Sequence, residues 1–129
     1  MYDKSLILDI LEDFIGATET IIYRCSKVSC MDDFIDDEEG QMLLDSICML
    51  LIVIGESVKQ IDKITNKELL HKYPAIPWEN VAGMRDILSH HYFDLNAETV
   101  YGLCEDHIKD LNNTLKQIYH ELKSQPFRD

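Results

Sequence analysis

Positively charged residues are scarce in this chain of 129 residues. It has 12 lysine and arginine residues against 24 aspartate and glutamate residues, which gives a formal net charge of -12. Proteins that coat nucleic acids non-specifically neutralise the phosphates with lysine and arginine. We therefore expect no broad RNA-coating surface. Any phosphate chemistry must be local, or be completed by a second subunit.

Long apolar runs are lacking too, and the first residues do not predict a secretory signal. The longest apolar run, ICMLLIVIG (47–55), is shorter than the ~20 residues that span a bilayer. The first residues, MYDKSLILDILEDF, have no basic stretch before the apolar ones, unlike a secretory signal. A hydrophobic content of 46% argues against disorder. We expect a cytoplasmic protein with no membrane partner, folded as a single domain over residues 1–129.

The cysteines do not form a recognisable pattern. Cys25, Cys30, Cys48 and Cys104 lack the close paired spacing of a zinc site, and apolar, helix-like segments surround them. Reduced, mostly buried thiols are the prediction. Cys104 and His107 could ligate a metal from one helix face, but two ligands alone make a weak case. We expect neither a bound metal nor a cofactor.

Apolar residues recur at alternating steps of three and four, and no segment alternates with the period of a β-strand. A helix is predicted over roughly residues 2–27 and another over roughly 37–65, where the acids of residues 36–39 suit a helix N-terminus. Residues 47–54 are apolar on every side, which predicts a central helix. The two stripes consist of Ile7, Leu11, Phe14, Thr18, Ile21 and Cys25, and of Leu43, Ile47, Leu50, Ile54, Val58 and Ile61.

Two further helices are predicted. A short one over about residues 78–90 places Val81, Met84 and Leu88 on one face, and a long one covers roughly 97–123, with Asn96 as its N-cap. Long helices with modest connections predict an all-α fold, an antiparallel four-helix-type bundle with a short extra helix. The stripe of the last helix consists of Val100, Cys104, Ile108, Leu111, Leu115, Ile118 and Leu122.

The stretch RDILSHHYF (85–93) carries the strongest chemical signal. On a helix, residues five apart such as Arg85 and His90 are separated by roughly 140°, so they do not stack. Asp86 and His90 do share a face, and so do Arg85, Ser89 and Tyr92. Asp86 could therefore fix the tautomer of His90 while Arg85 swings round to hold a phosphate through paired hydrogen bonds.

Structural roles are the alternative for these residues. Arginine, aspartate and histidine near a helix C-terminus often form only a surface ion pair and a cap, and Tyr92 could be an aromatic anchor. His91 falls on the Met84 and Leu88 side, which favours a packed histidine. The remaining histidines, at positions 71, 107 and 120, are isolated on amphipathic segments and are not expected to be catalytic.

The spacing of Arg85, His90 and Tyr92 resembles R-x4-H-x-Y, the signature of HepT-like proteins in the HEPN superfamily of ribonucleases and toxins. The segments IGESVKQI (54–61) and YPAIPWENVAGMRD (73–86) also look like that family's sequence around the motif. The resemblance covers essentially the whole chain. It implies a helical bundle that forms a two-fold homodimer, with the motifs of both subunits facing one cleft.

The resemblance also implies an activity. Family members of this type are toxins of toxin-antitoxin pairs, and active members cleave RNA without a metal. Arg85 and His90 would be catalytic, and RNA, as transfer RNA or messenger RNA, would be the substrate. The antitoxin would be a minimal nucleotidyltransferase that attaches AMP to Tyr92. The family usually has asparagine or another polar residue where this chain has Asp86, and an acid there could orient His90 or repel a phosphate.

Two other functions fit the same residues. The chain could be a noncatalytic helical dimer that binds a nucleotide or a protein as the regulatory half of a nucleotidyltransferase complex, which the acidic charge and Asp86 favour. It could also be a plain helical interaction module. Cleavage of RNA by the purified protein, with a His90→Ala control, separates the enzyme from both alternatives.

Overall fold

The computed structural model describes residues 2–90 and 93–125, with side-chain surroundings for all of these except residues 89, 90 and 93–95. No β-strand occurs in these ranges, so the all-α prediction is confirmed. The elements in chain order are α1 (Lys4–Cys25), the 3-10 helix η1 (Met31–Phe34), α2 (Glu38–Thr65), α3 (Glu68–His71), α4 (Trp78–Ala82), α5 (Met84–His90), α6 (Phe93–Asp106) and α7 (Ile108–Ser124).

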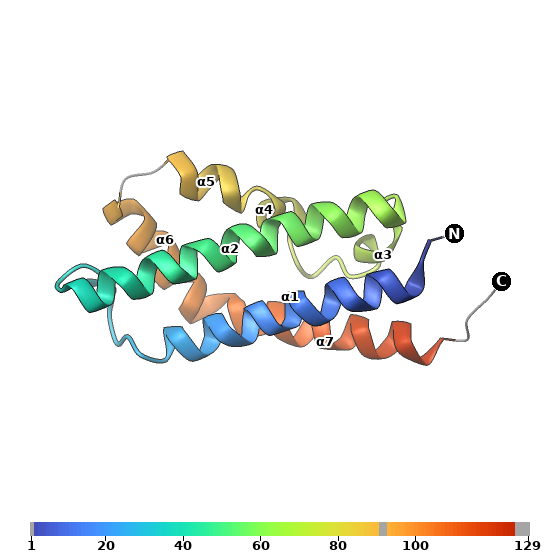
Figure 1. Ribbon diagram of the computed structural model, residues 1–129, viewed down its shortest axis with the longest axis horizontal. Helices are drawn as coiled ribbons and strands as arrows, with labels where there is room; N and C mark the ends of the chain where they lie inside the picture. The colour runs from blue at the N-terminus through green and yellow to red at the C-terminus, as the bar shows by residue number, and fades with distance from the viewer. Residues whose placement is uncertain (1, 91–92, 126–129) are drawn as a thin grey trace.

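The helices form an elongated bundle in which successive segments reverse direction (Figure 1). α1 and α2 run antiparallel, α4 and α5 return along α2, and α6 and α7 run back toward the end of the bundle where the chain starts. α1 packs mainly on α7 and α2, whereas α2 also contacts α3, α4, α5 and α6. The predicted antiparallel bundle is thus confirmed, with α2 as the helix that the others share.

Aspartates begin both long helices. The side chain of Asp3 accepts a hydrogen bond of 3.1 Å from the backbone N–H of Leu6, and Asp37 accepts one of 2.7 Å from Gly40. Each bond satisfies an N–H that has no partner within its own helix. α2 ends at Asn66, which adopts the left-handed conformation with φ 53° that often terminates a helix. The acidic start predicted for this helix is confirmed.

The core consists of one stripe from each long helix. Ile7, Leu11, Phe14, Thr18 and Ile21 of α1 are all buried, as their spacing predicts. In α2 the buried stripe contains Leu44 and Leu51, while the predicted Leu43 and Leu50 are only half-buried. At both places the buried leucine is one residue after the predicted one. Neighbouring positions in this helix are also apolar, so the pattern alone cannot tell which of the two is buried.

The two later predicted helices are each interrupted. The shorter one is divided at Gly83 into α4 and α5, and the longer one is divided at His107 into α6 and α7. At both points one run of helical hydrogen bonds ends and another begins, from Ile87 N–H to the Gly83 carbonyl at 3.2 Å and from Leu111 N–H to the His107 carbonyl at 3.1 Å. Each predicted helix is therefore two successive helices, and the prediction of a single helix is wrong in both places.

Polar side chains connect α1 to α7. The buried Asn112 amide donates a 2.9 Å hydrogen bond to the hydroxyl of Thr18, also buried. Nearer the surface, the Lys116 ammonium lies 3.0 Å from a Glu19 carboxylate oxygen. The pairing of the buried amide matters most, because an unpaired buried polar group costs about 1–3 kcal/mol.

α2 is central in its contacts but not enclosed. The helix is central as predicted, but Met49 and Val53 are 63% and 45% exposed, so one face of its apolar segment is open to solvent. Within the described ranges, α2 alone is long and apolar enough to cross a membrane. Such a helix is weak evidence for a membrane span, since core helices of bundles pass the same test of length and composition. Here its buried face packs on five other helices of the bundle.

Candidate active site

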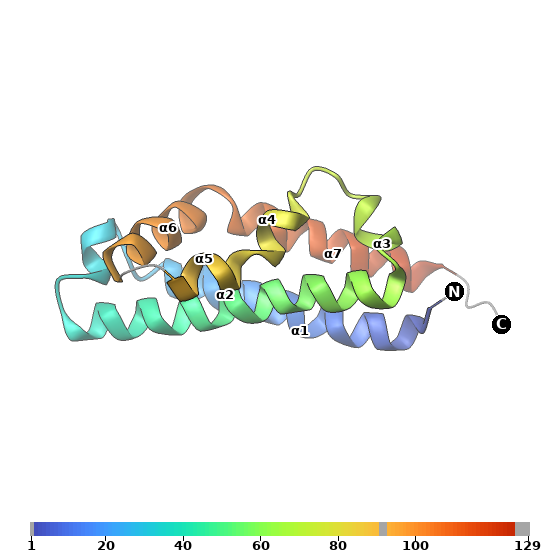
Figure 2. The ribbon, with the colours of Figure 1, turned by 90° about the horizontal axis from the view of Figure 1, so that it is seen from above.

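A glycine in α2 sets the position of α5. A Cβ atom at Gly55 would lie 2.9 Å from the carbonyl oxygen of Val81 and 3.2 Å from that of Ala82. The end of α4 therefore lies closer to α2 than a larger residue would permit. Gly83 follows, and α5 begins at the next residue, so this close approach determines where the first turn of α5 lies along α2 (Figure 2).

Arg85, in the first turn of α5, faces the exposed side of α2. One guanidinium nitrogen, Nη1, lies 3.5 Å from Oε1 of Glu56, and Nζ of Lys59 lies 3.8 Å from the same oxygen. All three side chains are solvent-exposed, with 62%, 49% and 48% of the Arg85, Glu56 and Lys59 side chains accessible. Exposed ion pairs contribute only about 0–1 kcal/mol. The cluster therefore does little for stability, and it presents two cations around one acid.

Glu56 is a site residue that sequence reasoning did not identify. It lies in the segment IGESVKQI, but nothing in the spacing links position 56 to position 85. Only the packing of α4 and α5 on α2 brings the two together. A signal that could have found it is the position of this acid directly after the apolar run and three residues before Lys59.

The other predicted motif residues are described less completely. Asp86 is exposed and has no ion-pair partner within the described part of the chain. His90 is the last residue of α5, four positions after Asp86 on the same helix, but its side chain lies outside the described ones. His91 and Tyr92 lie outside the described residues altogether. The convergence of Arg85 and His90 and the hydrogen bond from His90 to Asp86 stay predictions.

Asn96 joins α6 to α5. α6 begins at Phe93, so Asn96 lies inside the helix, and the prediction that it is the N-cap is wrong. Its side-chain amide donates a 3.2 Å hydrogen bond to the carbonyl oxygen of Leu88. Leu88 belongs to the last turn of α5, whose carbonyls have no partner within the helix. Asn96 thus caps the helix that carries the motif.

An apolar stripe on α2 lies beside the ion cluster. It consists of Met42, Met49 and Val53, which are 65%, 63% and 45% exposed, and Glu56 follows Val53 on the same helix face. Ile87 on α5 is also exposed, at 36%. Exposed apolar side chains that gather in one patch are typical of protein contact surfaces. Arg85 lies at the end of this apolar stripe.

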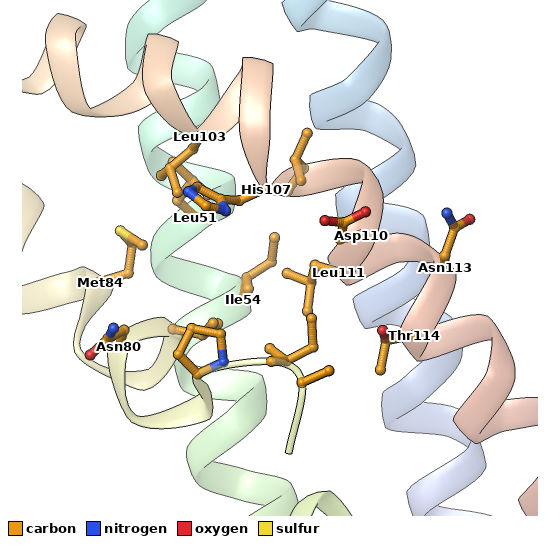
Figure 3. Close-up of a pocket in the computed structure, with 15 residues that line it drawn as sticks. Leu51, Ile54, Asn80, Met84, Leu103, His107, Asp110, Leu111, Asn113 and Thr114 are labelled. Carbon is orange, nitrogen blue, oxygen red and sulfur yellow. The ribbon is translucent and has the colours of Figure 1, made fainter. Parts of the chain in front are cut away.

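A separate cavity of about 550 Å³ lies on the inner side of α4 and α5 (Figure 3). Its floor is apolar and includes Leu51 and Ile54 of α2, while His107 and Asp110 lie at the start of α7. Met84 contributes to its wall, but Arg85 and Asp86 are not among its lining residues. The cavity and the Arg85 cluster are therefore on different faces of the α4–α5 segment.

The cysteine prediction is wrong in two respects. Cys25 and Cys104 form a disulfide between α1 and α6, with their Cα atoms 5.7 Å apart, and Cys30 is exposed. The two cysteines are 79 residues apart in the sequence, so no local pattern predicts that their helices meet at this point. Cys48 is a half-buried free thiol, and burial, followed by the charge of Asp45, raises its pKa to about 11. At neutral pH this thiol is protonated and is a poor nucleophile.

Histidines outside the motif lie apart from the Arg85 cluster. His71 is in the last turn of α3, His107 lies between α6 and α7, and His120 is on the exposed side of α7. Among the described residues, no three histidine, cysteine, aspartate or glutamate side chains are grouped as metal ligands.

These features define a helical bundle with an exposed motif arginine on a short helix packed against its central helix. Residues 7–118 match the family model described as "Ribonuclease HepT-like". The chain therefore belongs to the HepT-like family, which confirms the resemblance seen in the motif.

Related sequences align with nearly the full length of this chain. A protein of Methanocaldococcus jannaschii named "Putative RNase MJ0127" is 31% identical over 123 residues, 95% of this chain and 84% of the relative. The Caldanaerobacter subterraneus protein "Putative RNase TTE0752" is 32% identical over 88% of this chain and 94% of its own length. "Probable ribonuclease HepT" of Thermococcus cleftensis is 29% identical over 85% and 93%. No solved structure gives a significant match. The family assignment supports a ribonuclease function.

Proposed function

We propose that this chain is a metal-independent endoribonuclease, the toxin of a toxin-antitoxin pair that acts in the cytoplasm. The observation that carries the proposal is the position of Arg85, whose exposed guanidinium shares a single carboxylate with Lys59 in an otherwise acidic chain. A phosphate could displace that carboxylate, since exposed ion pairs are weak. RNA, as transfer RNA or messenger RNA, is the proposed substrate.

The proposed reaction is a transphosphorylation. His90 removes the proton from a ribose 2′-hydroxyl, the 2′-oxygen attacks the adjacent phosphorus, and the bond from phosphorus to the 5′-oxygen breaks. Arg85 stabilises the negative charge that builds on the phosphoryl oxygens. A second histidine is needed to protonate the leaving 5′-oxygen, and the products are a 2′,3′-cyclic phosphate and a 5′-hydroxyl.

A two-fold homodimer would supply that second histidine. The apolar stripe of Met42, Met49 and Val53 supports such a dimer, because a two-fold axis pairs the same patch from both copies. Glu56 lies three residues beyond Val53, which is about 5 Å along the helix axis. Burying the stripe would therefore bring both Arg85 side chains to the edge of one shared interface.

Control by a partner completes the proposal. A cognate minimal nucleotidyltransferase would attach AMP to Tyr92, and the added anionic phosphate would bind the cations that otherwise hold RNA. The toxin would then be inactive without being degraded. Measuring intact mass after reaction with the transferase tests this, since Tyr92→Phe protein should gain no AMP. Undiminished labelling would remove Tyr92 as the acceptor.

One observation favours a noncatalytic second candidate. Asp86 is exposed beside Arg85, and the negative charge of an acid there repels a phosphate. The chain would then be a helical subunit of a nucleotidyltransferase complex that binds a nucleotide or a protein through the same surface.

Cleavage by the purified protein decides between the two. We expect labelled RNA to be cut in the presence of EDTA, and we expect His90→Ala to lower the rate by about 10²–10⁴-fold. Arg85→Ala should lower it by roughly 10²–10³-fold. Cleavage that persists unchanged in His90→Ala protein would come from another site, and absence of cleavage by the unmodified dimer would favour the noncatalytic subunit.

A further inference from the structure

The charge on α2 is divided between its two halves. The first half, from residue 38 to residue 50, contains Glu38, Glu39 and Asp45 and no basic residue. The second half contains Lys59 and Lys63, both exposed, beside the acids Glu56 and Asp62. With Arg85, which pairs with Glu56, this region has three cations and two acids, in a chain with twice as many acids as bases.

The two lysines lie on the same face of the helix as the ion cluster. Glu56, Lys59 and Lys63 are three and four residues apart, the spacing that places side chains one above another. Glu56 is shared by Arg85 and Lys59, so these three groups together keep one positive charge. Lys63 has no ion-pair partner in residues 2–90 and 93–125.

The neighbouring acid, Asp62, is less exposed than the two lysines. Asp62 is half-buried, and burial raises the pKa of its carboxyl, with the charge of Lys67 acting in the opposite direction. Asp62 thus interacts with a cation from beyond the end of α2. Lys59 and Lys63 are exposed, and they lie in the part of α2 that leads from Glu56 toward its end near α3; Figure 1 shows α3 at that end of α2.

We infer that Lys59 and Lys63 bind successive phosphates of the single RNA strand whose scissile phosphate is held by Arg85, an inference that rests on the function proposed above. Residues four apart on a helix are separated by about 6 Å along its axis. This separation is comparable to that of consecutive phosphates in an extended strand. The strand would run along the second half of α2, away from the acidic first half.

The ion pair between Lys59 and Glu56 is weak enough for a phosphate to replace the carboxylate. Lys59 is 3.8 Å from Glu56 and half-exposed, a geometry in which the ion pair contributes about 0–1 kcal/mol. A phosphate that replaces the carboxylate gains the release of counterions from the RNA, which a protein acid cannot supply. RNA rather than an acidic protein is therefore the favoured ligand of this face.

Binding should be measured in a His90→Ala background, so that the RNA is not cut. The probe is a fluorescein-labelled oligouridylate, titrated with dimeric protein over a series of salt concentrations. The test variant adds Lys59→Ala and Lys63→Ala, and alanine keeps the helix because it has the highest helix propensity. Lys116→Ala is the matched control, since Lys116 is 52% exposed and also paired with a glutamate, but on α7.

We expect the double variant to bind roughly tenfold more weakly near physiological salt. The negative slope of log affinity against log salt should become shallower by about 1.4, because each lost single-strand phosphate contact removes ~0.7 from its magnitude. Lys116→Ala should keep both values. Equal affinity and slope in the double variant, while the wild-type protein still cleaves RNA, would overturn the inference and leave the proposed function standing.

Two other outcomes are also decisive. If the His90→Ala protein binds no RNA and the wild-type protein cuts none, the proposed function fails and this inference fails with it. If RNA binding is unchanged but the lysine variants lose binding to the purified nucleotidyltransferase, the lysines belong to a protein interface and the inference is wrong. Helix content measured by circular dichroism should be equal in all variants.

Discussion

On the α1–α7 side of the bundle, polar side chains of facing helices bind one another, whereas on the α2–α5 side apolar and cationic side chains face solvent. Thr18 binds Asn112 across the first side, and Glu19 binds Lys116. On the second side, Met49 and Val53 are exposed, and within residues 2–90 and 93–125 the one ion-pair partner of Arg85 is the exposed Glu56. The first side is complete within one chain, and the second has the features of a surface that binds other molecules.

Of the predicted changes, an acid placed in the apolar stripe of Met42, Met49 and Val53 should have the largest effect, because it should disrupt the α2–α5 side. We expect Val53→Asp to abolish dimerisation, because like charges brought together in an interface cost several kcal/mol. RNA cleavage should be lost with the dimer. Sedimentation velocity measures the oligomeric state. Leu6→Asp is the control, since Leu6 is 42% exposed against 45% for Val53 but lies on α1. A Val53→Asp protein that stays dimeric would contradict the interface.

A side chain at Gly55 should disturb the α2–α5 side next most strongly. The added Cβ of Gly55→Ala meets backbone carbonyls of α4, and overpacking of this kind costs about 1–3 kcal/mol. Cleavage should fall further than stability alone explains, because Arg85 moves with α4 and α5. Gly16→Ala is the control: nothing lies within 4 Å of its added Cβ, and it should stabilise α1 by roughly 0.5–1 kcal/mol. Urea unfolding measures the free energy of unfolding of both variants.

On the α1–α7 side, the buried hydrogen bond between Thr18 and Asn112 should affect only the stability of the fold. Thr18→Val removes the hydroxyl that Asn112 binds, and an unpaired buried amide costs about 1–3 kcal/mol. Replacing Asn112 by leucine as well should recover part of this loss. The dimer and the cleavage rate, measured below the unfolding transition, should be unchanged. A selective loss of cleavage in Thr18→Val protein would mean that the two sides are coupled.

The smallest predicted effect is a titration at the end of α7. Hydrogen bonds from Tyr73 first, then from Gln117, lower the pKa of Glu121 below its ordinary 4.5. A lowered folded pKa contributes stability above the unfolded pKa, and that contribution is lost as pH falls through the folded pKa. Tyr73→Phe should raise the pKa of Glu121 toward 4.5, as followed by NMR, while Tyr23→Phe should leave it unchanged. An unmoved Glu121 would exclude the Tyr73 hydrogen bond.

The fold was largely predictable because hydrophobic spacing determines which helix face is buried. The α1 stripe, the start of α2 at Asp37 and the antiparallel order all agree with the structure. Spacing could not detect the breaks at Gly83 and His107, because apolar residues keep their helical spacing across both points. The disulfide between Cys25 and Cys104 depends on where two distant helices meet, which no local pattern contains.

The candidate site was predictable only where it is local in sequence. Arg85, Asp86 and His90 lie within one short helix, so their relative positions follow from helical geometry. Glu56 and Lys59 join Arg85 only through the packing of α5 on α2, and the role of Asn96 depends on where α6 begins. Contacts between helices are the part that a one-dimensional pattern does not record.

The central claim is that two copies of this chain build a single site around one phosphodiester, and mixing subunits tests it most directly. Wild-type protein is exchanged with increasing amounts of Arg85→Ala/His90→Ala protein at constant total concentration, and RNA cleavage is measured. If each site needs both copies, activity falls with the square of the wild-type fraction. Activity that falls only in proportion to that fraction would contradict the account.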